Sequence, residues 1–431
     1  MEKTRRDFVK LVGGAALGAG AILASRSKAG AQAKTPKGVP SEPVKIGVIT
    51  LLQGTGALLG VPGLRGAEIW LEKTNAAGGI LGRKVEFYQE EETVPRETVE
   101  KFRKLTLQNK VDVVVGLIST GNGLAVGPVA EELGQLWLAW DATTQKGVEE
   151  TMLKPKYVFR APDNEWDAIA GVLMTAKHYP NIKTVAGINN DYSYGRDCWE
   201  TYVAALKEYL PNVRFVLDLW PKLGETEFTS HIAAIKKANP DLLMCSFWGG
   251  DNAIFFKQAA GAGLFQKMKG NFIAAGMSYF TLKKEFTPPG IVMGFNCYYF
   301  QALDTWPLGK WFVKRHLEKY KEYPGAECDN AYFTLEAYKA AIEKLYAVLG
   351  RWPTKEEIAL TLPGIQVPSI SGYRGFSEDN RAIPDCYVGL STHKNPFDFV
   401  TIERVEIFPP HMTQKPTGMK LHDWIKSWKK T

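Results

Sequence analysis

Residues 111–121, VDVVVGLISTG, decide the fold class of this 431-residue chain. The segment begins with an almost continuous apolar run, and a helical pattern follows it over residues 125–133. A strand that is apolar on both faces is typical of a parallel sheet covered by helices on both sides. The segment therefore predicts one strand, turn and helix of a parallel α/β fold.

The same strand and helix unit recurs in two separate series. The first series has predicted strands at residues 44–50, 84–89, 111–116 and 136–140, and helices at 63–75, 97–109 and 125–133. The second series has predicted strands at 183–188, 214–219, 241–247 and 271–274, and helices at 196–209, 228–238 and 252–262. A long amphipathic helix at 329–349 and a β-like tail at 386–408 follow. Two series of this length predict two Rossmann-like α/β lobes, each with a parallel central sheet.

The N-terminal residues differ in composition from the rest of the chain. An arginine pair at residues 5–6 precedes an apolar run of small residues at 11–24, and small residues follow at Ala31 and Ala33. This order is that of a signal peptide, and the arginine pair followed by an aromatic residue resembles the twin-arginine (Tat) type. The apolar run is too short for a comfortable membrane span, and an uncleaved anchor is the alternative. We expect cleavage near Ala31 or Ala33 and a mature protein in the periplasm.

Composition and charge exclude several classes of protein. Hydrophobic residues make up 45% of the chain and charged residues 23%, which is ordinary for a globular protein and unlike a disordered chain or a coiled coil. The formal charge of the chain is +7, and residues 1–33 carry +4 of it. The remaining charge is too weak to predict nucleic-acid binding. No segment after the signal is apolar for long enough to span a bilayer, so we expect no transmembrane span in the mature chain.

The five cysteines and six histidines predict neither a metal site nor a catalytic site. The cysteines form no C-x-x-C pair and have no histidine at zinc-ligand spacing, so we expect buried and mostly reduced thiols. The histidines are scattered, and the chain has no G-x-S-x-G nucleophile elbow and no Walker loop. We therefore expect no metal, no cofactor and no enzymatic activity, with an exported enzyme as an alternative.

A glycine-rich turn follows the first predicted strand. Gly54, Gly56 and Gly60 are spaced like part of a dinucleotide-binding loop. Such a site needs an acidic residue about 20 positions further on, and Glu90 comes too late. The turn is better interpreted as the carboxyl end of a strand in an open α/β sheet, where ligands bind. Leu59 in this turn is a candidate ligand-binding residue.

Hydroxyl-bearing residues follow two neighbouring strands of the first series. Ser119 and Thr120 end one strand and open a helix, and Asp141, Ala142 and Thr143 end the next strand in the same way. Hydroxyl groups and free backbone N–H groups at a helix N-terminus form an anion site. Simple capping of each helix is the alternative. Because the two clusters stand at equivalent strand ends, we predict that together they bind one carboxylate.

Aromatic residues occupy comparable strand ends. Trp140 directly precedes the second hydroxyl cluster, and Trp248 ends a predicted strand of the second series. Tyr192, Tyr279 and Phe280 lie in similar segments. Aromatic rings in these places are able to stack on a flat ligand, and ordinary packing within or between the lobes is the alternative. The pattern makes Trp248 a candidate ligand-binding residue.

Seven short patterns occur in a characteristic order along the chain. They are GA at 66–67 with NAAGGILGRKV at 75–85, G-x-x-S-T-G at 116–121, PVAEE at 128–132, AT at 142–143, DYSYG at 191–195, G-x-x-E-F at 224–228, and the segment 332–341. As a set, they closely resemble the leucine/isoleucine/valine-binding protein family of ABC importers. The resemblance covers roughly residues 44–390, and no single pattern carries it.

This resemblance implies the type I periplasmic-binding fold, in which a hinge of about three crossing segments joins two lobes. The ligand then sits in the cleft between the lobes and is bound by hinge closure, and the receptor is a monomer. The implied organisation comprises a signal at 1–33, a flexible leader at 34–43, a first lobe at 44–162 plus 277–368, and a second lobe with the tail at 163–276 plus 369–431.

The resemblance also implies roles for individual residues. Groups at the positions of Thr120 and Thr143 bind the ligand carboxylate in this family, helped by the backbone of the two strand-end turns. Tyr194 stands in a tyrosine-glycine motif of the second lobe that closes over the ligand. Glu225 falls where an acid pairs with an amino-acid ammonium group, although acids near a helix start are also favoured by the helix dipole alone.

The implied function is that of an exported solute-binding protein of an ABC importer. Its partners are then a permease in the inner membrane and the cytoplasmic ATPase of that permease. The expected ligand is a small carboxylate, such as a branched-chain or other amino acid. The aromatic strand ends leave an aromatic or non-amino carboxylate, or an amide, as an alternative. An extracytoplasmic ligand sensor of the same fold is a second alternative.

Overall fold

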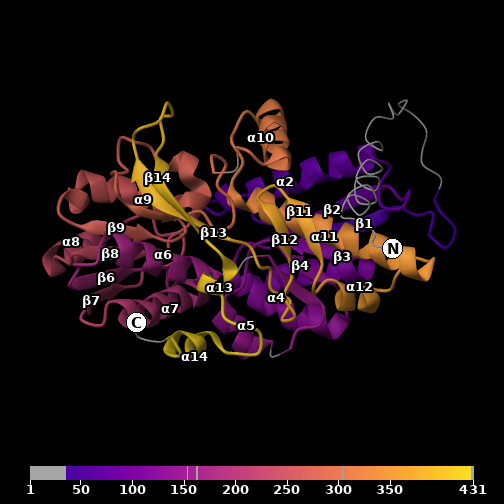
Figure 1. Ribbon diagram of the computed structural model, residues 1–431, viewed down its shortest axis with the longest axis horizontal. Coiled ribbons are helices and arrows are strands. Elements are labelled where there is room, and N and C mark those ends of the chain that lie inside the picture. The colour runs from indigo at the N-terminus through magenta and orange to yellow at the C-terminus, as the bar shows by residue number, and fades with distance from the viewer. Residues whose placement is uncertain (1–34, 153, 162–163, 303, 429–431) are drawn as a thin grey trace, which may run out of the picture.

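The computed structural model describes residues 35–152, 154–161, 164–302 and 304–428. The expected signal peptide and its cleavage sites lie outside these residues. The described chain forms two α/β lobes, each built on its own sheet, with the first lobe on the right of Figure 1 and the second on the left. This confirms the fold class predicted from the alternating strands and helices.

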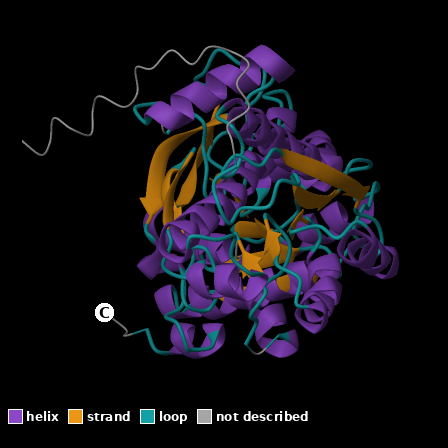
Figure 2. Cartoon of the chain, turned by 90° about the vertical axis from the view of Figure 1, so that its right-hand side faces the viewer, coloured by secondary structure: helices purple, strands orange, loops and turns teal. Residues whose placement is uncertain are grey.

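The first lobe contains a five-stranded, all-parallel sheet in the order β2-β1-β3-β4-β5. Its strands are β1 (Val44–Thr50), β2 (Val85–Glu91), β3 (Val113–Gly116), β4 (Trp137–Ala139) and β5 (Val158–Arg160). Its helices are α2 (Ala57–Ala76), α3 (Pro95–Arg103) continued by the π-helical turn η1 (Lys104–Gln108), α4 (Thr120–Leu133) and α5 (Gln145–Thr151). All residues of β3 and β4 are buried, because helices surround the sheet (Figure 2).

The second lobe contains a seven-stranded sheet in the order β14-β13-β10-β9-β8-β6-β7. Its strands are β6 (Thr184–Ile188), β7 (Arg214–Leu219), β8 (Leu242–Cys245), β9 (Lys269–Phe272), β10 (Val292–Gly294), β13 (Cys386–Thr392) and β14 (Thr401–Phe408). Its helices are α6 (Asn164–His178), α7 (Ser193–Tyr209), α8 (Thr229–Ala238), α9 (Gly249–Gly261), and the 3-10 turns η2 (Leu264–Gln266) and η3 (Ala275–Thr281). In this sheet β13 pairs antiparallel with both β10 and β14, and the other pairings are parallel. Strands β13 and β14 form the expected β-like tail.

The chain returns to the first lobe after β10. The returning elements are α10 (Pro307–Tyr320), α11 (Ala326–Leu349), α12 (Lys355–Thr361) and the hairpin β11 (Gln366–Ser369) with β12 (Gly372–Gly375). Two short helices end the described chain, α13 (Pro410–Thr413) and α14 (Leu421–Lys426). Because β10 pairs with β9 in the second sheet, the return lies beyond the expected boundary at residue 277.

Helices α2 and α11 pack closely against each other in the first lobe. Gly66 on α2 permits this approach, since a Cβ there would lie 2.5 Å from the carbonyl oxygen of Cys328 on α11. The contact anchors the N-terminal end of α11 beside the space between the lobes.

Two crossings between the lobes run side by side and are hydrogen bonded. The Arg160 N–H donates to the Asn380 carbonyl (2.9 Å), and the Ala382 N–H donates to the Arg160 carbonyl (2.8 Å). The buried Arg374 guanidinium donates to the Ala161 carbonyl at 3.1 Å. These bonds tie the first and last crossings into one hinge element.

No helix among the described residues is long and apolar enough to cross a membrane. All five cysteines are buried, and none of them forms a disulfide bond: Cys198, Cys245, Cys297, Cys328 and Cys386.

Candidate functional site

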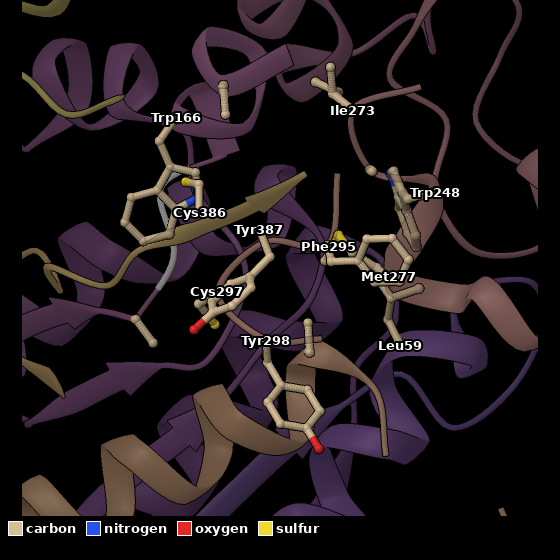
Figure 3. Close-up of a cluster of buried hydrophobic side chains, with 14 of the residues drawn as sticks. Leu59, Trp166, Trp248, Ile273, Met277, Phe295, Cys297, Tyr298, Cys386 and Tyr387 are labelled. Carbon is tan, nitrogen blue, oxygen red and sulfur yellow. The ribbon is translucent and has the colours of Figure 1, made fainter. Parts of the chain in front are cut away.

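A small cavity lies between the two lobes. Its lining residues are Leu59, Ile118, Thr120, Asp141, Tyr192, Tyr194, Trp248 and Met277. Thr120 follows β3, Asp141 follows β4 and Trp248 follows β8, so the cavity lies at the carboxyl ends of strands from both sheets. Open α/β sheets bind ligands at this edge. Figure 3 shows Leu59, Met277 and Trp248 beside one another at this place.

Thr120 begins α4 and lines the cavity with a buried side chain. The turn before it is held by Glu92, whose carboxylate accepts hydrogen bonds from the N–H groups of Ile118 (2.7 Å) and Ser119 (2.8 Å) and from the Asn122 amide (2.8 Å). Burial raises the pKa of Glu92 to about 7, although these three hydrogen bonds oppose the shift. Because Glu92 occupies the Ser119 N–H, a ligand has the Thr120 hydroxyl and the first-turn N–H groups of α4 as donors.

The turn after β4 has a strained backbone. Ala142 (φ 58°) and Thr143 (φ 70°) both lie in the left-handed region, which β-branched residues seldom adopt. Gly123 on α4 makes room for them, since a Cβ there would lie 2.9 Å from the Ala142 Cβ and the Thr143 Cγ2. The turn presents Asp141 to the cavity and buries Thr143 completely. Strain of this kind is concentrated at ligand sites.

Three aromatic side chains form the wall that the second lobe contributes. The Trp248 Nε1 donates to the Tyr192 hydroxyl at 2.9 Å, and the ring centroids of Tyr192 and Tyr194 are 5.9 Å apart. Trp248 also reaches the first lobe, because a Cβ on Gly56 would lie 3.4 Å from its ring. These rings offer a broad apolar surface with two hydroxyl groups.

The two lobes contact each other on either side of the cavity. On the lower side of Figure 1, Thr144 caps α5 and donates its hydroxyl to Asp197 on α7 at 2.6 Å, and the Lys146 ammonium lies 3.3 Å from the same carboxylate. On the upper side, the Gly250 N–H of α9 donates to the Thr55 carbonyl at 3.2 Å. The structure is therefore a closed form, in which both lobes bound the cavity.

Most of the predicted site residues come together in the structure. Those lining the cavity are Leu59, Thr120, Asp141, Tyr194 and Trp248. Those in the two strand-end turns behind the lining are Ser119, Ala142 and Thr143. Two lining residues, Ile118 and Met277, are ordinary apolar residues, and no sequence pattern marks them as part of a site.

Glu225 is a predicted site residue that lies outside both the cavity lining and the two strand-end turns. Its partly exposed carboxylate accepts hydrogen bonds from the N–H groups of Glu227 (3.2 Å) and Thr226 (2.9 Å). These bonds hold the pKa of Glu225 below its ordinary value. Glu225 is thus engaged in the structure of its own loop.

Sequence reasoning missed a second acid near the cavity, Glu327 in the first turn of α11. Its side chain is 0% exposed, and neither carboxylate oxygen has a hydrogen-bond partner among the described residues. Burial raises the pKa of Glu327 well above its ordinary value, and the negative charge of Asp141 raises it further. Acidic residues are common at helix starts, where they interact favourably with the helix dipole. The sequence therefore does not indicate that Glu327 is buried.

Residues 43–392 match a protein-family model described as periplasmic binding protein. Among curated proteins, Leu/Ile/Val-binding protein homolog 7 of Brucella suis is 24% identical over 229 residues, which are 51% of this chain and 56% of that protein. The chain therefore spans little more than half the length of this curated relative.

Solved structures share the two-lobed fold. A solute-binding protein of an ABC transporter from Rhodopseudomonas palustris, in complex with 3,4-dihydroxybenzoic acid, has a TM-score of 0.74 at 20% identity and covers 86% of this chain and 98% of its own. A leucine-binding protein from Thermotoga maritima has a TM-score of 0.70 at 21% identity and covers 85% of this chain and 99% of its own. At these identities the likeness is one of fold.

Proposed function

This chain belongs to the periplasmic binding protein family of the Leu/Ile/Val-binding type, and from this premise we propose that it is the ligand-capturing component of an ABC importer. Its ligand is a small carboxylate with an apolar or aromatic body. The observation that carries the proposal is the cavity between the lobes, which joins a helix N-terminus from one lobe to an aromatic wall from the other.

The first lobe supplies the anion-binding end of the cavity. The Thr120 hydroxyl and the first-turn N–H groups of α4 are donors next to the positive end of the helix dipole. The Glu92 carboxylate holds this turn in place, so the donors need no rearrangement when a ligand binds. A carboxylate is the small anion that such a donor set fits.

The second lobe supplies the apolar end. Trp248, Tyr192 and Tyr194 surround the space above Leu59 and Met277. These side chains suit an aromatic ring or a branched aliphatic chain. This apolar end supports either an aromatic carboxylate or a branched-chain amino acid as the ligand. These are the two kinds of ligand named for the structural relatives.

Closure of the hinge couples binding to transport. A ligand that contacts both walls favours the closed form by its additional contacts there. The bonds from Thr144 and Lys146 to Asp197 are made only when the lobes meet. The closed receptor then docks on an inner-membrane permease, whose ATPase subunits supply the energy for import.

Calorimetric titration of the ligand-stripped protein tests the carboxylate assignment. The panel is leucine, phenylalanine, benzoate and 4-hydroxybenzoate, each with its primary amide. At least one acid should bind, and its amide should bind more than tenfold more weakly because the amide group lacks the negative charge of the carboxylate. Thr120→Val should weaken binding of that acid by roughly 1.5–3 kcal/mol, which is the contribution of a hydrogen bond to a charged group.

Thr151→Val is the matched control, because the Thr151 hydroxyl donates only within its own helix, to the Gly147 carbonyl. It should bind as the wild type does. An amide that binds as tightly as its acid would contradict the carboxylate assignment. A panel with no binder at all would contradict the proposed ligand class.

A further inference from the structure

We propose that the segment 409–428 is a strap that holds the two lobes together and thereby opposes opening of the hinge. The strap comprises α13, α14 and the turn between them. It lies after residue 392, where the match to the family model ends. The inference goes beyond the proposed function, because it concerns the equilibrium between open and closed forms rather than the ligand.

The strap is anchored at the hinge. The Lys415 ammonium donates to the Asp379 carboxylate at 2.8 Å, and the Arg381 guanidinium donates to the Lys415 carbonyl at 2.8 Å. Between these two partners lies Asn380, whose carbonyl accepts the hydrogen bond from the Arg160 N–H of the first crossing. Lys415 is buried, and a charged pair away from water is screened little by salt. The strap therefore starts from the hinge itself.

Beyond this anchor, the strap packs on the second lobe. Helix α13 lies against α6, and α14 lies against α7, beneath which it runs in Figure 1. Leu421 and Ile425 of α14 are buried. Trp428 makes an edge-on contact with Tyr209 at the end of α7, with 5.5 Å between the ring centroids. Burial of these apolar side chains stabilises the strap on α7.

The strap also reaches the first lobe. The Leu421 N–H donates to the Glu149 carboxylate on α5 at 3.1 Å. The same carboxylate oxygen accepts from the Gln145 amide at 2.7 Å, and the Gln145 amide oxygen accepts from Arg160 at 2.9 Å. A hydrogen bond to a charged acceptor is stronger than one between neutral groups. Glu149 thus connects the strap to α5 and, through Gln145, to the first crossing.

These contacts oppose the separation of α5 from α7. The other end of α5 meets α7 through the hydrogen bond from Thr144 to Asp197. Opening of the hinge moves α5 with the first lobe and α7 with the second, whereas α14 contacts both helices. An open form therefore either loses the bond between Leu421 and Glu149 or lifts α14 from α7. The closed form keeps both contacts.

Two substitutions of Leu421 test the strap. Leu421→Pro removes both the N–H donor and the buried side chain at the first residue of α14, a position at which helices tolerate proline. Leu421→Ala shortens the side chain and keeps the donor. Small-angle X-ray scattering of the ligand-free proteins measures the open fraction. Leu421→Pro should raise the ratio of open to closed molecules about tenfold and increase the radius of gyration.

A matched pair of variants on α5 tests the other partner of the bond. Glu149→Ala removes the acceptor while α14 stays packed on α7, so it keeps the inference testable if Leu421→Pro does not fold. It should increase the radius of gyration as well. Glu150 is an exposed acid on the same helix, and Glu150→Ala should have the dimensions of the wild type.

A larger radius of gyration in Leu421→Pro than in Leu421→Ala would support the bond to α5 as the contact that opposes opening. Equal radii for the wild type, Leu421→Pro and Glu149→Ala would overturn the inference. Because all these proteins are ligand-free, neither result depends on the ligand, and the proposed function stands or falls by its own titration.

Discussion

At the scale of single residues, Glu92 connects the acid–base state of the protein to its ligand site. The pKa of this buried carboxyl is about 7 in the folded protein and 4.5 as an ordinary glutamate. The folded protein therefore keeps a proton that the unfolded chain releases. The stability that this contributes is present below pH 4.5 and is lost as the pH rises through 7, by an amount on the order of 3 kcal/mol.

Chemical denaturation between pH 4.5 and 8 measures this effect. The free energy of unfolding of the wild type should fall relative to that of Glu92→Gln as the pH rises. Because both proteins share all other titrating groups, the contributions of those groups to the pH dependence cancel in this comparison. Parallel pH profiles for the two proteins would refute the assignment.

The residue scale also marks the limit of what the sequence predicts about the site. Strand-end position predicts that Thr120, Asp141 and Trp248 lie close together, because parallel strands end at one edge of a sheet, and all three line the cavity. Strand-end position does not reveal the buried Glu327, which follows Asp141 by more than 180 positions and lies on a helix that begins after a chain crossing. Thr143 lies behind the cavity lining, because the left-handed conformation of its backbone changes the direction of the chain there.

At the scale of elements, the contact of α2 with α11 sets the position of Glu327. Gly66→Ala should destabilise the protein by about 1–3 kcal/mol, because the new Cβ meets the Cys328 carbonyl and forces the helices apart. This loss exceeds the gain of roughly 0.5–1 kcal/mol that alanine brings to a helix interior. Thermal denaturation followed by circular dichroism measures the difference.

Gly261→Ala is the control for this prediction, since a Cβ at the end of α9 would meet no atom within 4 Å. It should change the melting temperature little. A Gly66→Ala protein as stable as the wild type would mean that the two helices adjust without cost.

The elements themselves were largely predictable. The strands at Val44–Thr50 and Arg214–Leu219 have the predicted bounds, and the others differ by a few residues. Helix α4 starts at Thr120 rather than at 125, because its glycines weaken the helical pattern. One of them, Gly123, is needed for the close packing against the turn after β4. The three-residue strand β10 is too short to give a periodic pattern, and this displaced the predicted lobe boundary.

At the scale of the whole molecule, the bonds to Asp197 stabilise the closed form without touching the cavity. Asp197→Asn should weaken ligand binding by about tenfold, because it removes a charged partner of Thr144 and Lys146 that only closure provides. Calorimetry measures the affinity, and small-angle X-ray scattering of the ligand-free variant should report a larger radius of gyration.

Asp191→Asn is the matched control, since Asp191 pairs with Arg196 inside the second lobe alone. Its affinity and dimensions should equal those of the wild type. Unchanged values for Asp197→Asn would mean that the bond between the lobes contributes nothing to closure.

The enclosed thiols make the protein suitable for fluorescence labelling. Burial raises the pKa of all five cysteines, so maleimide dyes, which react with exposed thiolates, will leave them unmodified in the folded state. Val348→Cys on α11 and Lys237→Cys on α8 would each add one accessible attachment point, one per lobe. A donor and acceptor dye placed there would report opening and closing of single molecules by energy transfer, with every native cysteine retained.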